Sequence, residues 1–215
     1  MYREAATYTP KHARLYTYDE SLLDPALLRG QREEIFTEAA EQLYEFRLFT
    51  PEFCRLLIEE AEHSGQWRTE AEVAENPYSD VKDYCLPDTK QHLDKMPGLS
   101  AVYEQIIVRH LKPLMQQMWV TFKLQKISPP YVLKYSAEPG AIRAMELHHD
   151  LETVTLVTYL NEEFTGGGTY FPRWNYFTGK PAPGSAILYP GGLSHEHEGV
   201  AITEGRRYLL CGSFY

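Results

Sequence analysis

The pattern of apolar and polar positions divides the chain into a helical first part and a strand-rich second part. Over much of residues 24 to 119, apolar side chains recur every three or four positions, the period of a helix with one buried face. After residue 130 they come in short runs separated by glycine and proline, as in strands joined by turns. The expected strands are 131–135, 144–147, 153–160, 168–171, 185–189 and 207–214.

The first helix is expected to begin near Asp24, which can cap it, with Pro25 in its first turn. Ile35, Ala39 and Leu43 then recur at a four-residue spacing and predict that the helix continues to this point. Residues 44–49 alternate and predict a strand.

A second helix has clear end signals. Thr50 is its expected N-cap, Pro51 its first residue and Gly65 its stop, and its buried stripe comprises Phe53, Leu57 and Ala61. A third helix is expected over 99–119, with Val102, Ile106 and His110 on one face and a kink or restart at Pro113.

Residues 1–23 and 66–97 show no clear period, so we expect an irregular arm and a long loop. A loop of this length is uncommon in a compact domain unless it serves a site, which favours a substrate-side loop. The alternative is a poorly ordered surface excursion.

The chain of 215 residues is long enough for a single domain with its own core. Helices followed by strands predict an α+β fold, a double-stranded β-helix (jelly-roll) barrel with N-terminal helices packed on one sheet. The three cysteines are widely spaced and form no CxxC pair, which argues against a disulfide framework or a zinc site.

The net charge of −9 argues against a nucleic-acid partner and is mildly favourable for a cationic one, although solubility alone explains such a charge. No apolar run reaches the length of a membrane span, and the first residues lack a signal-peptide core. We therefore expect no membrane association. A cytoplasmic location is the default, and the lumen of the endoplasmic reticulum is the alternative if a leader has been removed.

Two short histidine clusters carry the candidate chemistry. On a strand, His148 and Asp150 share one face while His149 points to the other, and His195 and His197 share a face in the same way. Two histidines and one carboxylate form the facial triad of non-haem Fe(II) oxygenases, which leaves coordination positions open.

Arg207 favours His197 over His195 as the third ligand, since it lies ten residues beyond His197 on the next strand. A guanidinium there can bind a carboxylate in a bidentate fork. A dicarboxylic keto acid would then chelate iron at one end and meet Arg207 at the other, as 2-oxoglutarate does. Two other classes stay open: a non-catalytic metal-binding β-barrel, and a metal-dependent isomerase or hydrolase on a cupin barrel.

These motifs together resemble the catalytic domain of the procollagen lysyl hydroxylases, within the Fe(II)- and 2-oxoglutarate-dependent prolyl and lysyl hydroxylase superfamily. The resemblance covers roughly residues 42–215 and leaves 1–41 as an arm with the first helix. The segments that carry it are His148 to Asp150, Thr153 to Thr155, Leu160-Asn161, Gly166 to Gly168, Phe171, Arg173, Asn175, Pro190-Gly191, His195 to Gly199 and Gly205 to Tyr208.

The resemblance implies that His148, Asp150 and His197 bind iron, and that Arg207 binds the distal carboxylate of 2-oxoglutarate with help from Tyr135. The chain departs from the family pattern at Val157, where the family has asparagine, and at Thr169, where it has cysteine. The loop between residues 67 and 97 differs most, and we expect substrate choice to be set there.

The resemblance also implies a function: hydroxylation of a peptide or protein side chain, with Fe(II), 2-oxoglutarate and O2 as reactants and ascorbate as reductant. Lysine is the expected target. Proline, another protein or a small molecule is the alternative. A homodimer formed through the catalytic domain is a further implication.

Overall fold

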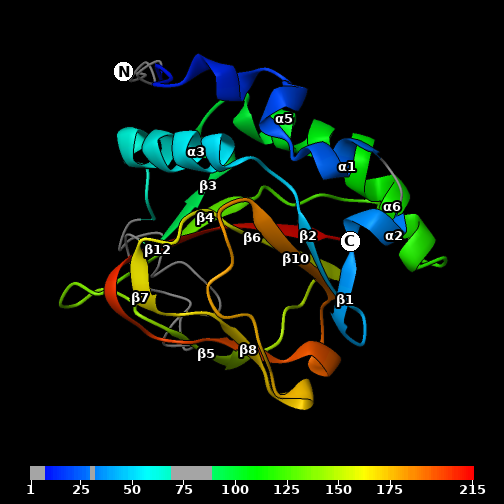
Figure 1. The fold of residues 1–215 in the computed structure, drawn as a ribbon. Coiled ribbons are helices and arrows are strands. Elements are labelled where there is room, and N and C mark those ends of the chain that lie inside the picture. The colour runs from blue at the N-terminus through cyan, green and yellow to red at the C-terminus, as the bar shows by residue number, and fades with distance from the viewer. Residues whose placement is uncertain (1–7, 30–31, 69–88) are drawn as a thin grey trace, which may run out of the picture.

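A computed structural model describes residues 8–29, 32–68 and 89–215. Two antiparallel sheets face each other, with the larger above the smaller in Figure 1. The larger sheet contains, in spatial order, β1 (Thr37–Ala40), β2 (Leu43–Arg47), β10 (Ser185–Pro190), β6 (Val154–Tyr159), β12 (Ile202–Phe214), β4 (Tyr131–Ser136) and β3 (Lys90–His92), and β7 (Phe164–Gly166) pairs with β12. The smaller sheet contains β5 (Met145–His148), β11 (His197–Gly199), β8 (Thr169–Phe171) and β9 (Tyr176–Phe177).

The helices lie on the side of the larger sheet that faces away from the smaller one (Figure 1). They are α1 (Pro25–Arg29), α2 (Arg32–Ile35), α3 (Pro51–Ser64), α5 (Leu99–Ile106), the π-helical η4 (Ile107–Leu111) and α6 (Lys112–Met118). Short 3-10 turns are η1 (Ala13–Tyr16), η2 (Glu20–Leu22), η3 (Leu93–Lys95), η5 (Pro172–Trp174) and η6 (Leu193–His195). The predicted fold class, a double-stranded β-helix with N-terminal helices on one sheet, is confirmed.

Alternation along the central strands produces two hydrophobic clusters on the two faces of the larger sheet. In β12, Leu210 joins the cluster beneath the helices, whereas its neighbour Leu209 joins the cluster between the sheets. In β6, Leu156 and Val157 divide in the same way, because successive side chains on a strand point to opposite faces. The face between the sheets is the one that reaches the candidate site.

The end signals of the second helix are confirmed. The Thr50 side chain accepts a hydrogen bond of 3.3 Å from the amide of Phe53. Gly65 follows the helix with φ of +57°, the left-handed conformation that glycine adopts without a Cβ clash.

The expected continuation of the first helix to Leu43 is wrong. The chain leaves the helical conformation after Ile35 and forms the hairpin of β1 and β2, with Ala39 in the first strand, Leu43 in the second and Gln42 at a φ of +59° in the turn. The three residues lie in three different elements, so their spacing reflects no common period. Pairing of β2 with β10 holds the second strand of the hairpin in place.

The third helix has the expected extent but changes type in the middle. Residues 107–111 form a π-helical turn immediately before Lys112 and Pro113. Proline has no amide hydrogen, so the wider turn accommodates the hydrogen bond that a regular helix would lose there.

The segment 66–97 was expected to be irregular, but Lys90–His92 forms the edge strand β3, which pairs with β4. Residues 69–88 lie outside the described residues, and so does most of the predicted substrate-side loop. The division of the chain at residue 41 stays a prediction. Within the described ranges, no helix combines the length and the apolar character needed to cross a bilayer.

A buried carboxylate attaches the N-terminal arm to α3. Glu60 has no exposed surface and accepts hydrogen bonds from the hydroxyls of Tyr8 and Tyr16 and from the amides of Lys11 and His12. Burial by itself raises the pKa of Glu60, but the hydrogen bonds from the two tyrosines and the two amides outweigh it and hold the pKa below its usual value.

Replacing Glu60 with glutamine is therefore expected to lower the free energy of unfolding at pH 7 by about 1 to 3 kcal/mol, as for loss of a buried charged acceptor. Because the folded-state pKa is depressed, the contribution is present above the unfolded pKa and is lost as pH falls through the folded one. Urea unfolding of both proteins between pH 3 and 7 measures this. The difference should shrink on acidification, and a difference that grows would contradict the assignment.

Candidate metal centre

Two paired strands of the smaller sheet bring the predicted ligands together. His148 on β5 and His197 on β11 are direct partners in the register, and Asp150 follows two residues after His148. One ligand atom from each of the three side chains lies within 4.8 Å of the other two. His148 Nε2 is 3.8 Å from Asp150 Oδ1, and His197 Nε2 is 3.9 Å from Asp150 Oδ2.

Backbone carbonyls determine which nitrogen of each ring is available. His148 Nδ1 lies 2.7 Å from the carbonyl oxygen of Glu146, and His197 Nδ1 lies 3.0 Å from that of His195. A carbonyl only accepts, so each Nδ1 carries the hydrogen and each Nε2 keeps its lone pair toward Asp150. Burial, followed by the neighbouring His197, lowers the pKa of His148 to about 4, so this ring is neutral near pH 7.

This donor set fits Fe(II). Two neutral imidazole nitrogens and one carboxylate on one side of an ion leave its remaining positions free. The described residues contain no other group of three or more histidine, cysteine, aspartate or glutamate side chains with this spacing.

The two remaining candidate histidines lie apart from this group. His195 is buried, its Nε2 lies 3.2 Å from the carbonyl oxygen of Glu41, and its ring packs on Trp174. His149 lines the same cavity as the triad without joining the cluster of ligand atoms.

A cavity of about 550 Å³ opens beside the three ligands, between the two sheets. Its walls include Tyr135, one of the two predicted cosubstrate-binding residues. They also include the two positions that depart from the family pattern, Thr169 and Val157, and the apolar side chain of Val157 adds no hydrogen bond there. The cavity is large enough for a small dicarboxylic acid and part of a second molecule.

Arg207 lies behind the wall of this cavity and is 1% exposed. Its guanidinium donates hydrogen bonds of 2.9 Å to the carbonyl oxygen of Gly168 and 3.2 Å to Thr169 Oγ1, while Nε has no partner among the described residues. Its central carbon is 5.4 Å from the ring centre of Tyr135, its neighbour in the register. No carboxylate pairs with this buried cation within the described ranges, which is unusual for a charge out of water and favours an anionic ligand.

The triple glycine supports Arg207 through its backbone. Gly166, Gly167 and Gly168 all have positive φ, of 77°, 75° and 106°. A Cβ on Gly168 would come within 2.3 Å of the Phe177 ring, so glycine is needed where the chain turns toward the guanidinium.

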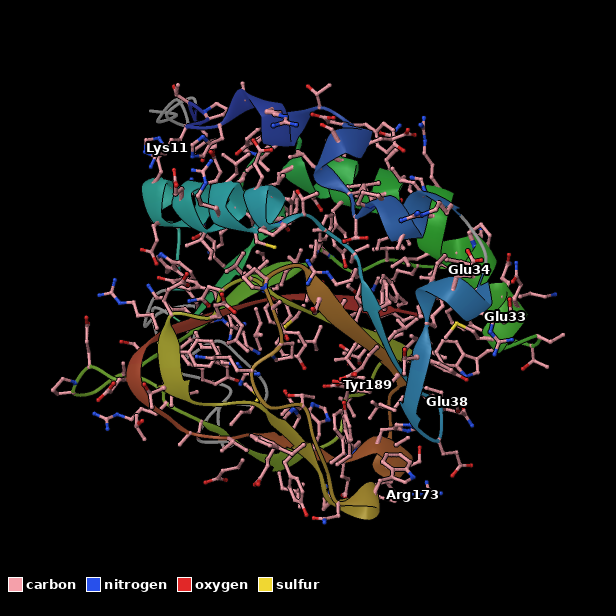
Figure 2. All side chains as sticks on the ribbon, in the orientation of Figure 1. Lys11, Glu33, Glu34, Glu38, Arg173 and Tyr189 are labelled. Carbon is pink, nitrogen blue, oxygen red and sulfur yellow. The ribbon has the colours of Figure 1, made fainter. Side chains whose placement is uncertain are left out.

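Sequence reasoning missed Tyr189, the single tyrosine of β10, which Figure 2 shows inside the barrel. Its hydroxyl donates a hydrogen bond of 3.1 Å to Asp150 Oδ2 and lies 3.2 Å from His197 Nε2. Burial, followed by the charge of Asp150, raises the pKa of Tyr189 well above its usual value, so the phenol stays protonated. Nothing in the sequence distinguishes it among sixteen tyrosines.

Tyr189→Phe is expected to weaken metal binding about tenfold, because outer partners that orient a ligand contribute about 10- to 100-fold to affinity. Anaerobic titration with Fe(II), followed by equilibrium dialysis, measures the change. Tyr170→Phe is the matched control, since its hydroxyl bonds to Asn175 instead. Equal affinities of the Tyr189 variant and the wild type would show that the hydroxyl does not orient Asp150.

Solved structures with this fold are known. The chain superposes on a prolyl hydroxylase from Trichoplax adhaerens in complex with a peptide of the hypoxia-inducible factor oxygen degradation domain, with a TM-score of 0.62 at 11% identity, over 92% of this chain and 96% of that one. It also matches the viral collagen prolyl hydroxylase of Paramecium bursaria Chlorella virus-1, solved with 2-oxoglutarate, with a TM-score of 0.58 at 16% identity, covering 81% and 96%. These likenesses show the fold of the chain, a double-stranded β-helix, and the His-Asp-His group adds a donor set that fits Fe(II).

Sequence comparison identifies the family of the chain. Residues 5–123, more than half of the chain, match the OGFOD2-like domain model, and the chain belongs to this family. It is 31% identical over 189 residues to a procollagen lysyl hydroxylase and glycosyltransferase of Acanthamoeba polyphaga mimivirus, which covers 85% of this chain and 20% of that protein. The chain spans about a fifth to a quarter of the length of the curated relatives it matches.

Proposed function

We propose that this chain is an Fe(II)- and 2-oxoglutarate-dependent oxygenase that hydroxylates a side chain of a peptide or protein, with lysine as the target. The observation that carries the proposal is one cavity with two chemically distinct ends. Three metal-ligating side chains converge at one end, and the buried, unpaired cation of Arg207 lies behind the other.

The roles of the residues follow from their positions. His148, Asp150 and His197 would hold Fe(II), Arg207 would bind the distal carboxylate of 2-oxoglutarate in a bidentate fork, and Tyr135 would close that pocket. Bound Fe(II), with 2-oxoglutarate and O2, supplies the oxidation that converts 2-oxoglutarate to succinate and CO2 and places one oxygen atom in a C–H bond. The apolar walls between the sheets exclude water and orient the substrate.

The curated relatives support lysine as the target, and one structural neighbour supports a peptide or protein substrate. The mimivirus relative is named as a lysyl hydroxylase, and the Trichoplax adhaerens neighbour is a prolyl hydroxylase solved with a peptide. Proline is the second candidate for this reason. Ascorbate as reductant belongs to the same proposal, and the implied homodimer stays a prediction.

Succinate formation by the iron-loaded protein tests the proposal. Three reactions with 2-oxoglutarate are compared: one with a collagen-like Gly-X-Lys peptide, one with a proline-rich peptide and one without peptide. We expect stimulation by the lysine peptide and a mass gain of one oxygen on that peptide. Stimulation by the proline peptide alone would replace lysine with proline, and no succinate under any condition would favour a non-catalytic metal-binding barrel.

A further inference from the structure

A second cavity adjoins the cavity at the metal centre. It has a volume of about 590 Å³, and Tyr131, Glu152 and Ser213 line both cavities. We call this second cavity the outer cavity. A substrate peptide bound in it could extend one side chain past these three residues toward the triad.

Glu152 contributes a carboxylate at this junction. It follows Asp150 by two residues, so their Cα atoms lie at most about 7.6 Å apart. Its carboxylate accepts a hydrogen bond of 3.4 Å from the Tyr215 hydroxyl, and no cation pairs with it among the described residues. Its backbone is held closely, because a Cβ on Gly191 would come within 2.0 Å of the Glu152 carbonyl oxygen.

Two hydroxyls lie on the wall beside it. They belong to Thr155 on β6 and Ser213 on β12, which are paired in the register. On its other side, Thr155 is paired with Tyr189 on β10. Thr155 lines the metal-site cavity and is 6% exposed, yet its Oγ1 has no hydrogen-bond partner within the described ranges. A buried hydroxyl without a partner, on a residue that lines a cavity, is a group that a small side-chain rotation would offer to a ligand.

The other charged side chains that line the two cavities apart from the triad are Lys90, Asp94 and Lys95. Lys90 already lies over the Tyr131 ring, 4.9 Å from its centre. Asp94 and Lys95 line only the outer cavity and carry opposite charges. The carboxylate at the junction is therefore the acidic group best placed to meet a cation that enters the metal-site cavity.

A lysine side chain matches this arrangement. Its apolar stem fits the walls formed by Leu133, Val157 and Leu209. Its ammonium group has three hydrogen-bond donors and no acceptor, which suits a carboxylate and two hydroxyls. Proline offers no cation and would leave the carboxylate and the Thr155 hydroxyl without partners.

We propose that Glu152, Thr155 and Ser213 form the site that binds the ammonium group of the target lysine and so select lysine over proline. The inference rests on the proposed function. It predicts that affinity depends on both the charge and the N–H donors of the target side chain.

The experiment measures peptide binding by calorimetry and turnover by succinate formation, on the iron-loaded protein with 2-oxoglutarate. Matched Gly-X-Lys peptides carry lysine, trimethyl-lysine or norleucine at the target position. Norleucine removes the charge, and trimethyl-lysine keeps the charge but removes the donors. For the wild type we expect the lysine peptide to bind on the order of tenfold more tightly than either analogue, the effect of one charged hydrogen-bonded contact.

The variants are Glu152→Gln and Thr155→Val, which keep the shape of the side chain. Each is expected to reduce the lysine-to-norleucine ratio of kcat/KM about tenfold, toward one. Glu34→Gln is the matched control, because Glu34 lies on α2 at the outer surface, well away from Tyr189 (Figure 2). An unchanged ratio in both variants would overturn the ammonium site.

Failure of the proposed function has a different signature. In that case the wild type produces no succinate with any peptide, whereas a failed ammonium site leaves stimulated succinate formation with no preference among the peptides. Binding that is equal for all three peptides would also overturn the inference, with or without turnover.

Discussion

Replacing His197 with alanine is expected to lower Fe(II) affinity at least about 100-fold and to reduce succinate formation to the level of the protein without metal. A residue that only hydrogen-bonds to a metal ligand contributes about 10- to 100-fold to metal affinity. The loss at His197 should be larger, because a direct ligand is removed. Anaerobic Fe(II) titration and succinate formation at saturating 2-oxoglutarate measure the two effects separately.

His149→Ala is the matched control for this variant. His149 lines the same cavity and is adjacent to His148 in the chain, but its ring lies outside the group of ligand atoms. Its affinity for Fe(II) should stay within a factor of two or three of the wild type, the ordinary spread for a side chain that binds nothing. If the His149 variant lost metal and the His197 variant kept it, the assignment of the triad would be wrong.

The second large effect is expected at Arg207. Arg207→Met keeps most of the apolar stem and removes the guanidinium, and it should raise the KM for 2-oxoglutarate at least about 100-fold. Breaking a buried charge pair costs about 3 to 5 kcal/mol, which corresponds to this factor or more. Affinity for Fe(II) should change little, because the contacts of Arg207 are to Gly168 and Thr169 rather than to the triad.

The same variant should be at least as stable as the wild type in the absence of 2-oxoglutarate. A buried guanidinium with an unpartnered Nε imposes a desolvation cost that methionine does not. 2-Oxoglutarate should raise the Tm of the wild type but not that of the variant, since only a bound ligand shifts the unfolding equilibrium. Thermal unfolding with and without 2-oxoglutarate measures both effects.

Arg206→Met is the control. Arg206 is adjacent in the chain but lies on the outside of the barrel, where it pairs with Glu138 at 2.5 Å and is 49% exposed. It should leave the KM for 2-oxoglutarate unchanged, as expected for an exposed ion pair. An equal rise in KM for both variants would mean a general disturbance of β12 instead of a lost carboxylate contact.

Local signals in the sequence were sufficient to predict the elements whose ends are set by neighbouring residues. The ends of α3 follow from the side chain of Thr50 and the left-handed conformation of Gly65, which act within one turn of the helix. The long central strands follow from alternation and from the turns between them. The hairpin of β1 and β2 could not be predicted in this way. The helical spacing of Ile35, Ala39 and Leu43 is coincidental, and the pairing of β2 with β10 is a contact between distant parts of the chain.

The shortest strands were missed for the same reason. Strands β3, β9 and β11 have two or three residues each, too few for a period to be recognised. They exist because a neighbouring strand offers hydrogen-bond partners. Sequence patterns do not contain that information.

At the candidate site, the sequence by itself determined the residue types and their spacing: an HxD pair, a distal histidine, and an arginine ten residues beyond it. Strand alternation also separates His148 and Asp150 from His149 without any tertiary information. Only the tertiary structure decided which other side chains reach this site. The Tyr189 hydroxyl contacts Asp150 and His197, and Thr155 faces the cavity, because β10, β6 and β12 pair in one register. Register between strands that are distant in the chain depends on the packing of the whole barrel, so no local pattern specifies it.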